Sequence, residues 1–564
     1  MITLPNITVR INGTPLSKTD AESLGRVRVQ QRLSLPTQCE LTFFEILAEG
    51  GHDTTPFNPG DAVEIAVDDL PTLLFSGQIT AIEYKYEPSG RQVLHIRAYD
   101  LLHQLRKRQP VRAHVELTTS ELASKLVSDL GVTVQAVEKG PLQRRIIQHC
   151  QTDFELLQEL ADQCGLYFTL RDKTLYLITL EGMGDTETLT LNKNLLEARI
   201  EINSDPACRS VTVDGWDTLS NKKHSGQTKR ARATELPNEA APDKVGGSGK
   251  HFLTNAIVEN DTQAKALAQA RLDAYAAREK TFWGVAEGAP HLQPGSRIKI
   301  EGLQNGDNAT HVLTSVNHLI DGHKGYLCEL STLPPAPQTR PTVSSCMITL
   351  GIVTRIQKQP GNIGRIRASL PSYNNIETGW MNTLFPGAGS KKGLIMLPDI
   401  GDHVAVIFAR GDLGQGIVIG SFYDTQIANV PEPGIENNGV KRFTFLSSSG
   451  HKITLDDAQG ALHIDAKGDL NIDAKGTFNI DAEGPLNIDS KGDTNIKTAG
   501  NAQIKTQGNT AIESDGDVSI KNGKGSSLSL LSGTAKLHSA TSLEIEAPGK
   551  SITIRGSKID FKKG

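Results

Sequence analysis

The C-terminal part of the chain carries a regular repetition of apolar and polar residues. Isoleucine recurs every eight residues from Ile464 to Ile520, and glycine recurs with the same spacing from Gly468 to Gly516. In the first units another apolar residue precedes the isoleucine by two positions, which is the period of a strand with one buried face. The pattern predicts one short strand in each eight-residue unit, or octad, with glycine adopting a positive φ at the corner between strands. The phase shifts by two residues after Gly525 and then resumes loosely.

The length of an octad limits what the strands can enclose. About five extended residues at ~3.3 Å each span only ~17 Å, which is too short for a wide single-chain coil around a filled core. Two closures remain: one chain forms a narrow triangular coil from three octads, or three chains wrap around one axis and each contributes every third strand. In the second closure the strands pair between chains and the apolar side chains form a dry axis. The needle-core residues of this intertwined trimer are Leu462, Ile464, Leu470, Ile472, Phe478, Ile480, Leu486, Ile488, Ile496, Ile504, Ile512 and Ile520.

Two other interpretations of this segment are weaker. A flexible polar tail has no reason to keep isoleucine in register through eight octads. Asp465, Asp473, Asp481 and Asp489 also recur every eight residues, but the calcium-binding β-helix repeat has nine residues and adjacent glycines. We therefore expect these aspartates on a solvated outer face.

The segment upstream of the octads is predicted to be a small barrel. Residues 348–424 contain five alternating apolar runs separated by Gly or Pro turns. Five short strands in a segment of this length are typical of a closed barrel of the OB type. A proline-rich stretch, Ser331–Val343, precedes it and a Pro/Gly/Asn-rich stretch, Thr425–Asn438, follows it. Both stretches are expected to be linkers.

The region before the barrel combines strands with a few helices. Residues 153–161 place their apolar side chains on one helical face, and Gly165 marks the end of that helix. Asp261–Lys280 is rich in alanine and is predicted to be a second helix. Ser220–Lys250 has little periodicity and is expected to be a long loop.

Length and charge narrow the possible functions. A chain of 564 residues is long enough for about four domains. The formal net charge is −5 and no basic run exceeds Arg106–Arg108, so the basic surface of a nucleic-acid-binding protein is missing. The N-terminus lacks the pattern of a signal peptide and no apolar stretch is long enough to span a membrane, so synthesis in the cytoplasm is expected. Six cysteines without a CxxC pair are expected to be reduced.

No motif for catalysis or cofactor binding stands out. The stretch VGGSGKH is similar to a phosphate-binding loop, but the first glycine of GxxxxGK[ST] would fall at Lys244 and the Ser/Thr at His251. GxSxG and HExxH are absent from the sequence. Histidines such as His318 and His403 stand singly in strand contexts. We therefore expect no enzyme activity, no cofactor and no metal site.

The barrel segment resembles the VgrG and phage baseplate spike family. PDIGDHVAVIF at 398–408, Gly411-Asp412 and IVIGSFY at 417–423 follow the family pattern P-x-I-G-x-x-V-x-V-x-F, G-D and P-x-V-x-G-x-x-Y, with Gln415-Gly416 where a proline often stands. Residues 75–105 are similar to the first hub barrel of phage tail-hub proteins. Residues 153–168 are similar to the helix-then-strand module of those proteins, and residues 294–326 to their second hub barrel.

This resemblance implies a mainly β fold with an α+β hub. The expected parts are a hub of two β-barrels with helical modules at 1–335, a linker at 336–347, an OB-fold barrel at 348–424, a linker at 425–440 and an intertwined trimeric β-helix needle at 441–564. It implies a structural, homotrimeric central spike of a contractile injection system, which joins a hexameric inner tube to a membrane-piercing needle. The implied partners are the inner tube and baseplate proteins, a PAAR-like tip protein, effector cargo and, transiently, a target membrane, but no nucleic acid.

The ends of the needle complete this expectation. The tip protein is expected to contact Ile559, Phe561 and Gly564, where the apolar axis ends. Only 16 residues separate the barrel from the needle, too few for a lysozyme-like domain, and no toxin domain is expected after it. These features resemble an extracellular, phage-tail-like injection system more than a type VI secretion VgrG, so release of the particle is expected. The alternative is a polysaccharide-cleaving or glycan-binding β-helix tail spike, with Asp473 and Asp481 as its carboxylate pair.

Overall fold

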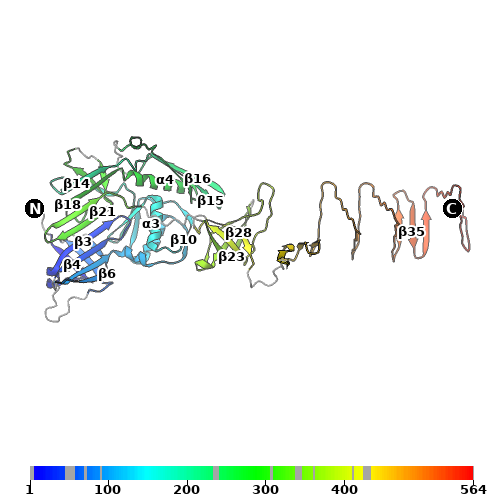
Figure 1. Ribbon diagram of the computed structural model, residues 1–564, viewed down its shortest axis with the longest axis horizontal. Helices are drawn as coiled ribbons and strands as arrows, with labels where there is room; N and C mark the ends of the chain where they lie inside the picture. The colour runs from blue at the N-terminus through cyan, green and yellow to red at the C-terminus, as the bar shows by residue number, and fades with distance from the viewer. Residues whose placement is uncertain are drawn as a thin grey trace. The chain divides into compact units, whose positions relative to one another are not determined.

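The computed structural model is mainly β with few helices (Figure 1). It divides into two compact units, Met1–Lys441 and Arg442–Gly564. The described residues are 5–44, 57–68, 73–88, 92–232, 240–304, 309–336, 346–359, 362–408, 412–423 and 434–562. We call the part up to residue 336 the hub region and residues 346–423 the barrel. Within the described residues, no helix is both long and apolar enough to span a membrane.

The hub region is organised by one large curled sheet. Its eleven strands follow the order β14-β18-β22-β21-β3-β4-β7-β6-β5-β1-β2. Antiparallel pairing of β3 with β21 joins the early strands to the late ones. The two hub barrels expected from the sequence are therefore two curled halves of one sheet. The bounds are β1 Ile7–Ile11, β2 Thr14–Pro15, β3 Leu24–Arg32, β4 Gln38–Phe44, β5 Ala62–Val67, β6 Phe75–Tyr86, β7 Gln92–Tyr99, β14 Leu195–Ile202, β18 Lys280–Glu287, β21 Ser315–Asp321 and β22 Gly325–Ser331.

Four smaller sheets complete the hub region. They are β10-β8, β11-β12-β9, β13-β19-β20 and β16-β15-β17. Their bounds are β8 Arg112–Leu117, β9 Thr133–Ala136, β10 Gln143–Gln148, β11 Tyr167–Arg171, β12 Thr174–Ile178, β13 Met183–Thr190, β15 Ser210–Asp217, β16 Lys222–Thr228, β17 Lys250–Ala256, β19 Ser296–Glu301 and β20 Thr310–Val312. The helices are α1 Lys18–Ser23, α2 Thr119–Val127, α3 Asp153–Cys164 and α4 Asp261–Ala276, with 3-10 turns at η1 Leu101–Lys107, η2 Ser128–Leu130, η3 Pro242–Val245 and η4 Pro371–Tyr373.

The predicted helix at 153–161 is confirmed as α3. Thr152 and Glu155 form a capping box at its start, in which each side chain accepts a hydrogen bond from the other residue's backbone N–H. Phe154 and Leu157 are buried on its inner face. Gly165 ends the helix in the left-handed conformation at φ 66°, which a side chain would disfavour.

The prediction of a long loop over 220–250 was wrong in part. Residues Lys222–Thr228 form β16, which pairs antiparallel with β15 along its whole length. At Gly226 the strand passes directly against α4, because a Cβ on this glycine would lie 2.2 Å from the backbone nitrogen of Lys265. The sequence of β16 is polar at most positions, so it carries no apolar alternation that would have revealed the strand.

The barrel is a six-stranded sheet with the order β25-β24-β23-β27-β28-β26. Its bounds are β23 Met347–Gln359, β24 Asn362–Leu370, β25 Ile376–Glu377, β26 Asn382–Thr383, β27 His403–Phe408 and β28 Gly416–Phe422. Alternate residues of β27, namely Val404, Val406 and Phe408, are fully buried in its core. A short hairpin of β29 Ile435–Glu436 and β30 Gly439–Val440 follows.

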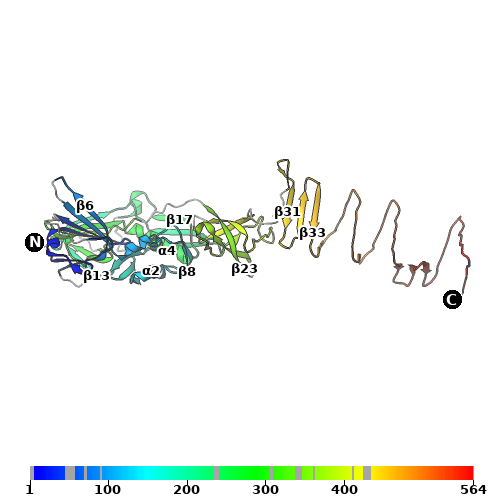
Figure 2. The ribbon, with the colours of Figure 1, turned by 90° about the horizontal axis from the view of Figure 1, so that it is seen from below.

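The second unit contains two small antiparallel sheets that flank an extended segment. The first sheet has β31 Arg442–Leu446, β32 Lys452–Asp456 and β33 Ala461–Asp465. The other has β34 Val518–Lys521, β35 Ser527–Leu531 and β36 Thr534–His538. Residues 466–517, all of which the structure describes, form no strand and follow a winding path (Figure 2). We call β31–β33 the proximal sheet, β34–β36 the distal sheet and 466–517 the octad segment.

The octad segment bends at regular intervals. Bends occupy residues 467–468, 475–476, 483–484, 491–492, 499–500, 507–508 and 515–516, each ending on the octad glycine. The predicted positions of the corners are therefore confirmed. The predicted positive φ was wrong, because none of these seven glycines adopts it. An open bend between two extended stretches needs no left-handed residue, unlike the tight turns at Gly450 and Gly525 in the flanking sheets.

Candidate assembly site

The predicted needle-core residues are all exposed in the single chain. Their exposed fractions range from 55% at Ile464 to 87% at Ile496. Leu462 and Ile464 lie on β33 and Ile520 lies on β34, where each faces a partner on the neighbouring strand. The nine residues between them lie in the octad segment and have no strand partner within the described chain. So long an apolar row in water is typical of a surface that another molecule covers.

The proximal sheet adds four apolar residues that the octad pattern did not include. Register places Phe443, Leu455 and Leu462 in one row across the three strands. A second row consists of Phe445, Ile453 and Ile464. Residues directly opposite on paired strands point to the same face, so all six side chains share one face, and all six are exposed. The alternation in RFTFL and KITLD around a Ser-Ser-Ser-Gly turn is the signal that would have revealed this hairpin.

The opposite face of the proximal sheet is mostly polar, with Leu446 as its exposed apolar exception, and its polar groups form hydrogen bonds within the chain. Arg442 Nε donates to the Asp456 carboxylate at 2.8 Å, and the backbone N–H groups of Ala458 and Gln459 donate to the same carboxylate. The Arg442 guanidinium holds the pKa of Asp456 below its usual value. Thr454 on this face is only 5% exposed, whereas Leu455 on the other face is 42% exposed. The sheet thus presents its apolar face outward.

The distal sheet repeats this arrangement. Ile520, Leu528 and Leu537 form one row, and Val518, Leu530 and Ala535 form the other. The hairpin between β34 and β35 is closed by Asn522, whose side-chain oxygen accepts hydrogen bonds from the backbone N–H groups of Lys524 and Ser526. The predicted phase shift after Gly525 is therefore a reversal of chain direction. The prediction of a slip within one continuous winding was therefore wrong.

Nothing in the described chain requires glycine at most of the octad corners. A Cβ added at Gly476, Gly484, Gly492, Gly500 or Gly508 would meet no atom within 4 Å. None of these glycines needs positive φ. A residue type that recurs without a conformational or steric reason in the single chain points to a neighbour outside it.

The predicted tip residues lie in the extended C-terminal stretch. Ile559 is 47% exposed and Phe561 is 90% exposed. Gly564 lies outside the described residues. Both side chains are thus exposed apolar groups near the end of the described chain.

The hub region and the barrel are joined by direct contacts within the first unit. Ile147, at the end of β10, is buried in the barrel core. The Arg145 guanidinium donates to the Glu377 carbonyl oxygen. From the barrel, the Asn382 amide donates to the Thr218 carbonyl oxygen at 2.8 Å. Arg145 lies near Arg367, and burial together with this like charge lowers the pKa of Arg145.

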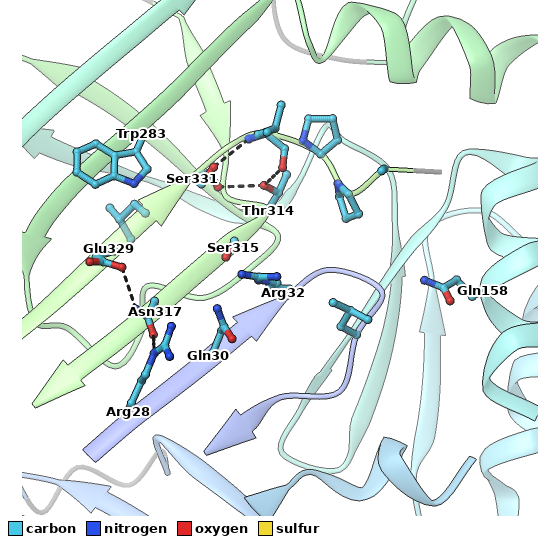
Figure 3. A pocket seen from close by; sticks show the side chains of 16 residues that line it. Arg28, Gln30, Arg32, Gln158, Trp283, Thr314, Ser315, Asn317, Glu329 and Ser331 are labelled. Atoms are coloured by element: carbon cyan, nitrogen blue, oxygen red, sulfur yellow. Dashed lines mark hydrogen bonds between the residues drawn. The ribbon is translucent and has the colours of Figure 1, made fainter. Parts of the chain in front are cut away.

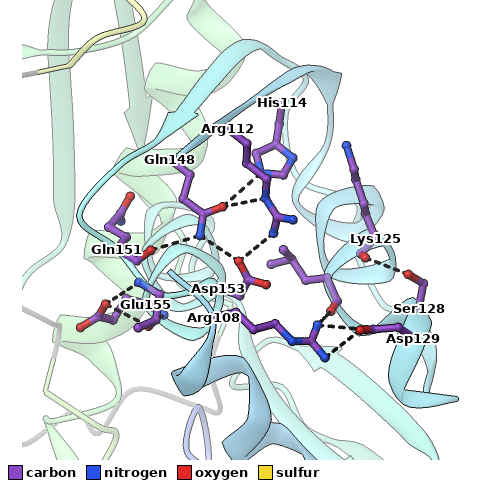
Figure 4. Close-up of polar contacts among 12 residues, drawn as sticks. Arg108, Arg112, His114, Lys125, Ser128, Asp129, Gln148, Gln151, Asp153 and Glu155 are labelled. Carbon is purple, nitrogen blue, oxygen red and sulfur yellow. Dashed lines mark hydrogen bonds and ion pairs between the residues drawn. The ribbon is translucent and has the colours of Figure 1, made fainter. Parts of the chain in front are cut away.

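A polar network holds β10 in place behind these contacts (Figure 4). Arg112 on β8 forms a 2.7 Å ion pair with Asp153 at the start of α3. The Gln148 amide on β10 donates to the same carboxylate at 2.8 Å and its oxygen accepts from Arg112 Nε at 3.0 Å. Because Asp153 is buried with all these partners in place, the network fixes β8, β10 and α3 as one rigid support.

A pocket among the described residues of the hub region is lined by hydrogen-bonded polar side chains. Its volume is about 550 Å³, and strands β3, β18, β21 and β22 line it (Figure 3). Its polar groups bond one another: Arg28 Nε donates to Asn317 at 3.0 Å, and Asn317 donates to Glu329 at 2.8 Å. No histidine or cysteine lines it. Paired interactions of this kind stabilise a sheet face rather than activate a nucleophile.

A buried Cys–His pair lies in the core of the hub region. The Cys328 sulfur lies 3.1 Å from His318 Nδ1, which also contacts the Tyr326 hydroxyl at 2.9 Å. Burial lowers the pKa of His318 to about 3 and raises the pKa of Cys328 to about 12. Both groups are neutral near pH 7 and shielded from solvent, so they are core residues. Among the described residues no group of three or more His, Cys, Asp or Glu could hold a metal ion.

Comparison with known proteins places this architecture in a family. Residues 3–322 match the family described as the Alg8 N-terminal domain. Residues 349–423 match the family described as the type VI secretion system/phage-baseplate injector OB domain.

Two curated proteins of Vibrio cholerae are similar to the chain. The type VI secretion system spike protein VgrG3 is 21% identical over 403 residues, which cover 64% of this chain and 39% of VgrG3. The actin cross-linking toxin VgrG1 is 24% identical over 391 residues, which cover 62% of this chain and 34% of VgrG1. The matched parts thus span between a third and two fifths of these relatives.

Among solved structures, an E. coli component of the type VI secretion system is similar to the chain. It is described as structurally similar to the T4 bacteriophage tail proteins gp27 and gp5. It is 12% identical, the likeness covers 73% of this chain and 99% of that chain, and the TM-score is 0.48. The chain thus belongs to the family described as the Alg8 N-terminal domain, whose match covers more than half of its length, and its injector OB domain and its VgrG relatives place it in the VgrG and phage baseplate spike family.

Proposed function

We propose that this chain is the homotrimeric central spike of a contractile injection system, with the octad segment as the shaft of an intertwined needle. The observation that carries the proposal is the row of exposed isoleucines on a segment whose backbone pairs with no strand of the described chain. Extended backbone leaves its N–H and C=O groups unpaired unless another strand supplies partners. Two further copies of the same segment would supply both the hydrogen bonds and the apolar cover.

The geometry of such a shaft follows from the octad. Each octad moves a chain by one strand spacing, about 4.7 Å, and by a third of a turn around the axis. Octad n of one chain then lies beside octad n+1 of its neighbour on the same face. Glycine at each corner gives the neighbouring chain room for this approach, which would account for the five octad glycines at which an added Cβ would meet no atom of the described chain.

The other parts of the chain fit a role as an adaptor. Two curled halves of one sheet in each of three copies would present six similar surfaces to a hexameric inner tube. The contacts of Ile147 and Arg145 with the barrel would transmit force from the hub region toward the needle. We propose baseplate proteins and effector cargo as further partners and the assembled particle, released from the cell, as the location. The target membrane would be met only transiently.

The C-terminal end is proposed to bind a small tip protein. Phe561 is almost fully exposed at the end of the apolar row, and a capping protein would cover it. Deleting 559–564 should abolish co-purification with a candidate tip protein. Equal recovery before and after the deletion would show that this contact is wrong.

No enzymatic step is part of the proposal. Asp473 and Asp481 are exposed in the octad segment, and no observation favours their use as the carboxylate pair of a glycan-cleaving spike. The relative VgrG1 is described as an actin cross-linking toxin, but this chain matches only 34% of its length.

Cysteine cross-linking tests the intertwined shaft directly. The background is Cys150→Ser with Cys346→Ser, because these are the two exposed free cysteines among the described residues. The pair Asn471→Cys and Asn479→Cys, one octad apart on the outer face, should form disulfides between chains under mild oxidation. Asn479→Cys alone should not, because equal octads lie on different faces. A double variant that stays uncross-linked would overturn the intertwined needle.

A further inference from the structure

The octad segment by itself defines only weakly how three chains align. A shift of one chain by eight residues would place seven of the eight isoleucines from Ile464 to Ile520 on another isoleucine and six of the seven octad glycines on another glycine. Strands with such a repeat specify their register weakly, and turns or non-repeating elements must set it. The proximal and distal sheets are non-repeating elements at the two ends of the octad segment, and the octads of Ile496, Ile504 and Ile512, which lack a second large apolar residue, depend most on such an element.

The two sheets are continuous with the isoleucine row. Ile464, the first octad isoleucine, lies on β33, and Ile520, the eighth, lies on β34. Each isoleucine is also a member of the exposed apolar face of its sheet. Whatever molecule covers the octad row therefore also reaches the apolar faces at both ends. If two other copies cover the row, as in the proposed function on which this step rests, the same two copies cover both faces.

Each sheet is built within a single chain. The three strands are consecutive and antiparallel, and they are joined by tight turns that contain Gly450 and Gly460 in the proximal sheet and Gly525 and Gly533 in the distal sheet. Short-range hairpins fix their own register through the turn geometry. A preformed three-stranded sheet can therefore define a unique alignment between chains whose central part is periodic.

We propose that the distal sheet docks its apolar face against the same face of two other copies and so locks the register of the octads at the far end of the shaft. The docking residues are Val518, Ile520, Leu528, Leu530 and Leu537. The hub region and the proximal sheet align the chains at one end. The distal sheet prevents any chain from slipping or looping out by one octad at the other end.

The test uses the full chain in the Cys150→Ser, Cys346→Ser background. Asn495→Cys alone reports slipping, because equal octads meet only when one chain has moved by eight residues. Asn495→Cys with Gln503→Cys reports correct register. With an intact distal sheet, the pair should cross-link between chains and the single cysteine should not. With Leu528→Asn and Leu530→Asn added, the single cysteine should now cross-link as well.

The matched control changes the polar face of the same sheet. Ser519→Asn and Lys536→Asn lie in one row across β34 and β36, on either side of Ser529. This control should keep the cross-linking pattern of the intact sheet. Loss of the trimer in the Leu528/Leu530 variant, but not in the control, would also support docking of the apolar face between copies.

Two results would separate failure of this inference from failure of the proposed function. If the Leu528/Leu530 variant remains a trimer and its single cysteine still fails to cross-link, the distal sheet does not set register, although the needle stands. If the pair fails to cross-link even with an intact distal sheet, and the protein is a monomer in solution, both the inference and the intertwined needle are overturned.

Discussion

Replacing Ile496 by alanine should destabilise the assembled protein, although the same change would cost little in a separate chain. In the single chain this side chain is 87% exposed. Full burial of an isoleucine contributes about 1.5–3 kcal/mol, so the part that still awaits burial corresponds to about 1.3–2.6 kcal/mol per chain. In a trimer the three copies of Ile496 together contribute about 4–8 kcal/mol to the free energy of unfolding. The alanine variant should lose most of this contribution.

The assay is urea unfolding of the full chain, followed by circular dichroism and by light scattering at each urea concentration. Lys497→Ala is the matched control, because Lys497 follows Ile496 directly and in the strands of the proposed shaft would point to the opposite, outer face. Ile496→Ala should lower the midpoint of the trimer transition and Lys497→Ala should not. A free energy of unfolding within about 0.5 kcal/mol of the wild type would refute the buried axis, since that is the usual effect of a surface substitution.

Three further changes test other parts of the account. Gly492→Ala should lower the thermal stability of the trimer, because the added methyl group would clash with a neighbouring chain. In a separate chain the same change would stabilise slightly, by about 0.4–1 kcal/mol. A rise in the melting temperature would therefore contradict a close neighbouring chain at this glycine. Asp100→Asn should steepen the loss of stability from pH 6 to about pH 4 in thermal melts. Burial raises the pKa of Asp100 to about 6, so protonation of this carboxyl stabilises the folded state as the pH falls from 6 to about 4. Burial lowers the pKa of His318 to about 3, so the unfolded chain binds this proton first and stability falls below about pH 6.5. Asp100 partly offsets this loss, and equal dependence of melting temperature on pH in the wild type and Asp100→Asn would refute the offset. Ile147→Ala should cost about 2–5 kcal/mol and speed proteolysis between hub region and barrel, whereas unchanged cleavage would argue against a rigid junction.

The sequence was most informative where one local rule acts many times. Isoleucine and glycine at a spacing of eight predicted the positions of all seven bends, because the chain must bend once in every octad. The helix over 153–161 was predictable because its caps at Thr152 and Gly165 act locally. The residues proposed for the needle core are all exposed in the single chain, and their burial between chains is a proposal, because it depends on other copies of the chain.

The features that the sequence did not predict depend on contacts between distant residues. Strand β16 lacks an apolar alternation, and it is positioned by β15 and by α4 passing over Gly226. The sequence did not reveal the distal sheet as a hairpin, because the alternation of apolar residues continues in β35 after the chain reverses at Asn522. Ile147 packs in the barrel core with residues that lie more than two hundred positions later in the chain. No local sequence pattern indicates such a contact.

The solution mass of the purified full chain tests the central claim most directly. One chain has a mass of 60.9 kDa. Light scattering should give three times this mass, independent of protein concentration over a wide range, because an intertwined shaft cannot separate without breaking its strand pairing. A mass of 60.9 kDa would contradict the account. The octads would then have to close within one chain, and their exposed isoleucine row would need a different partner.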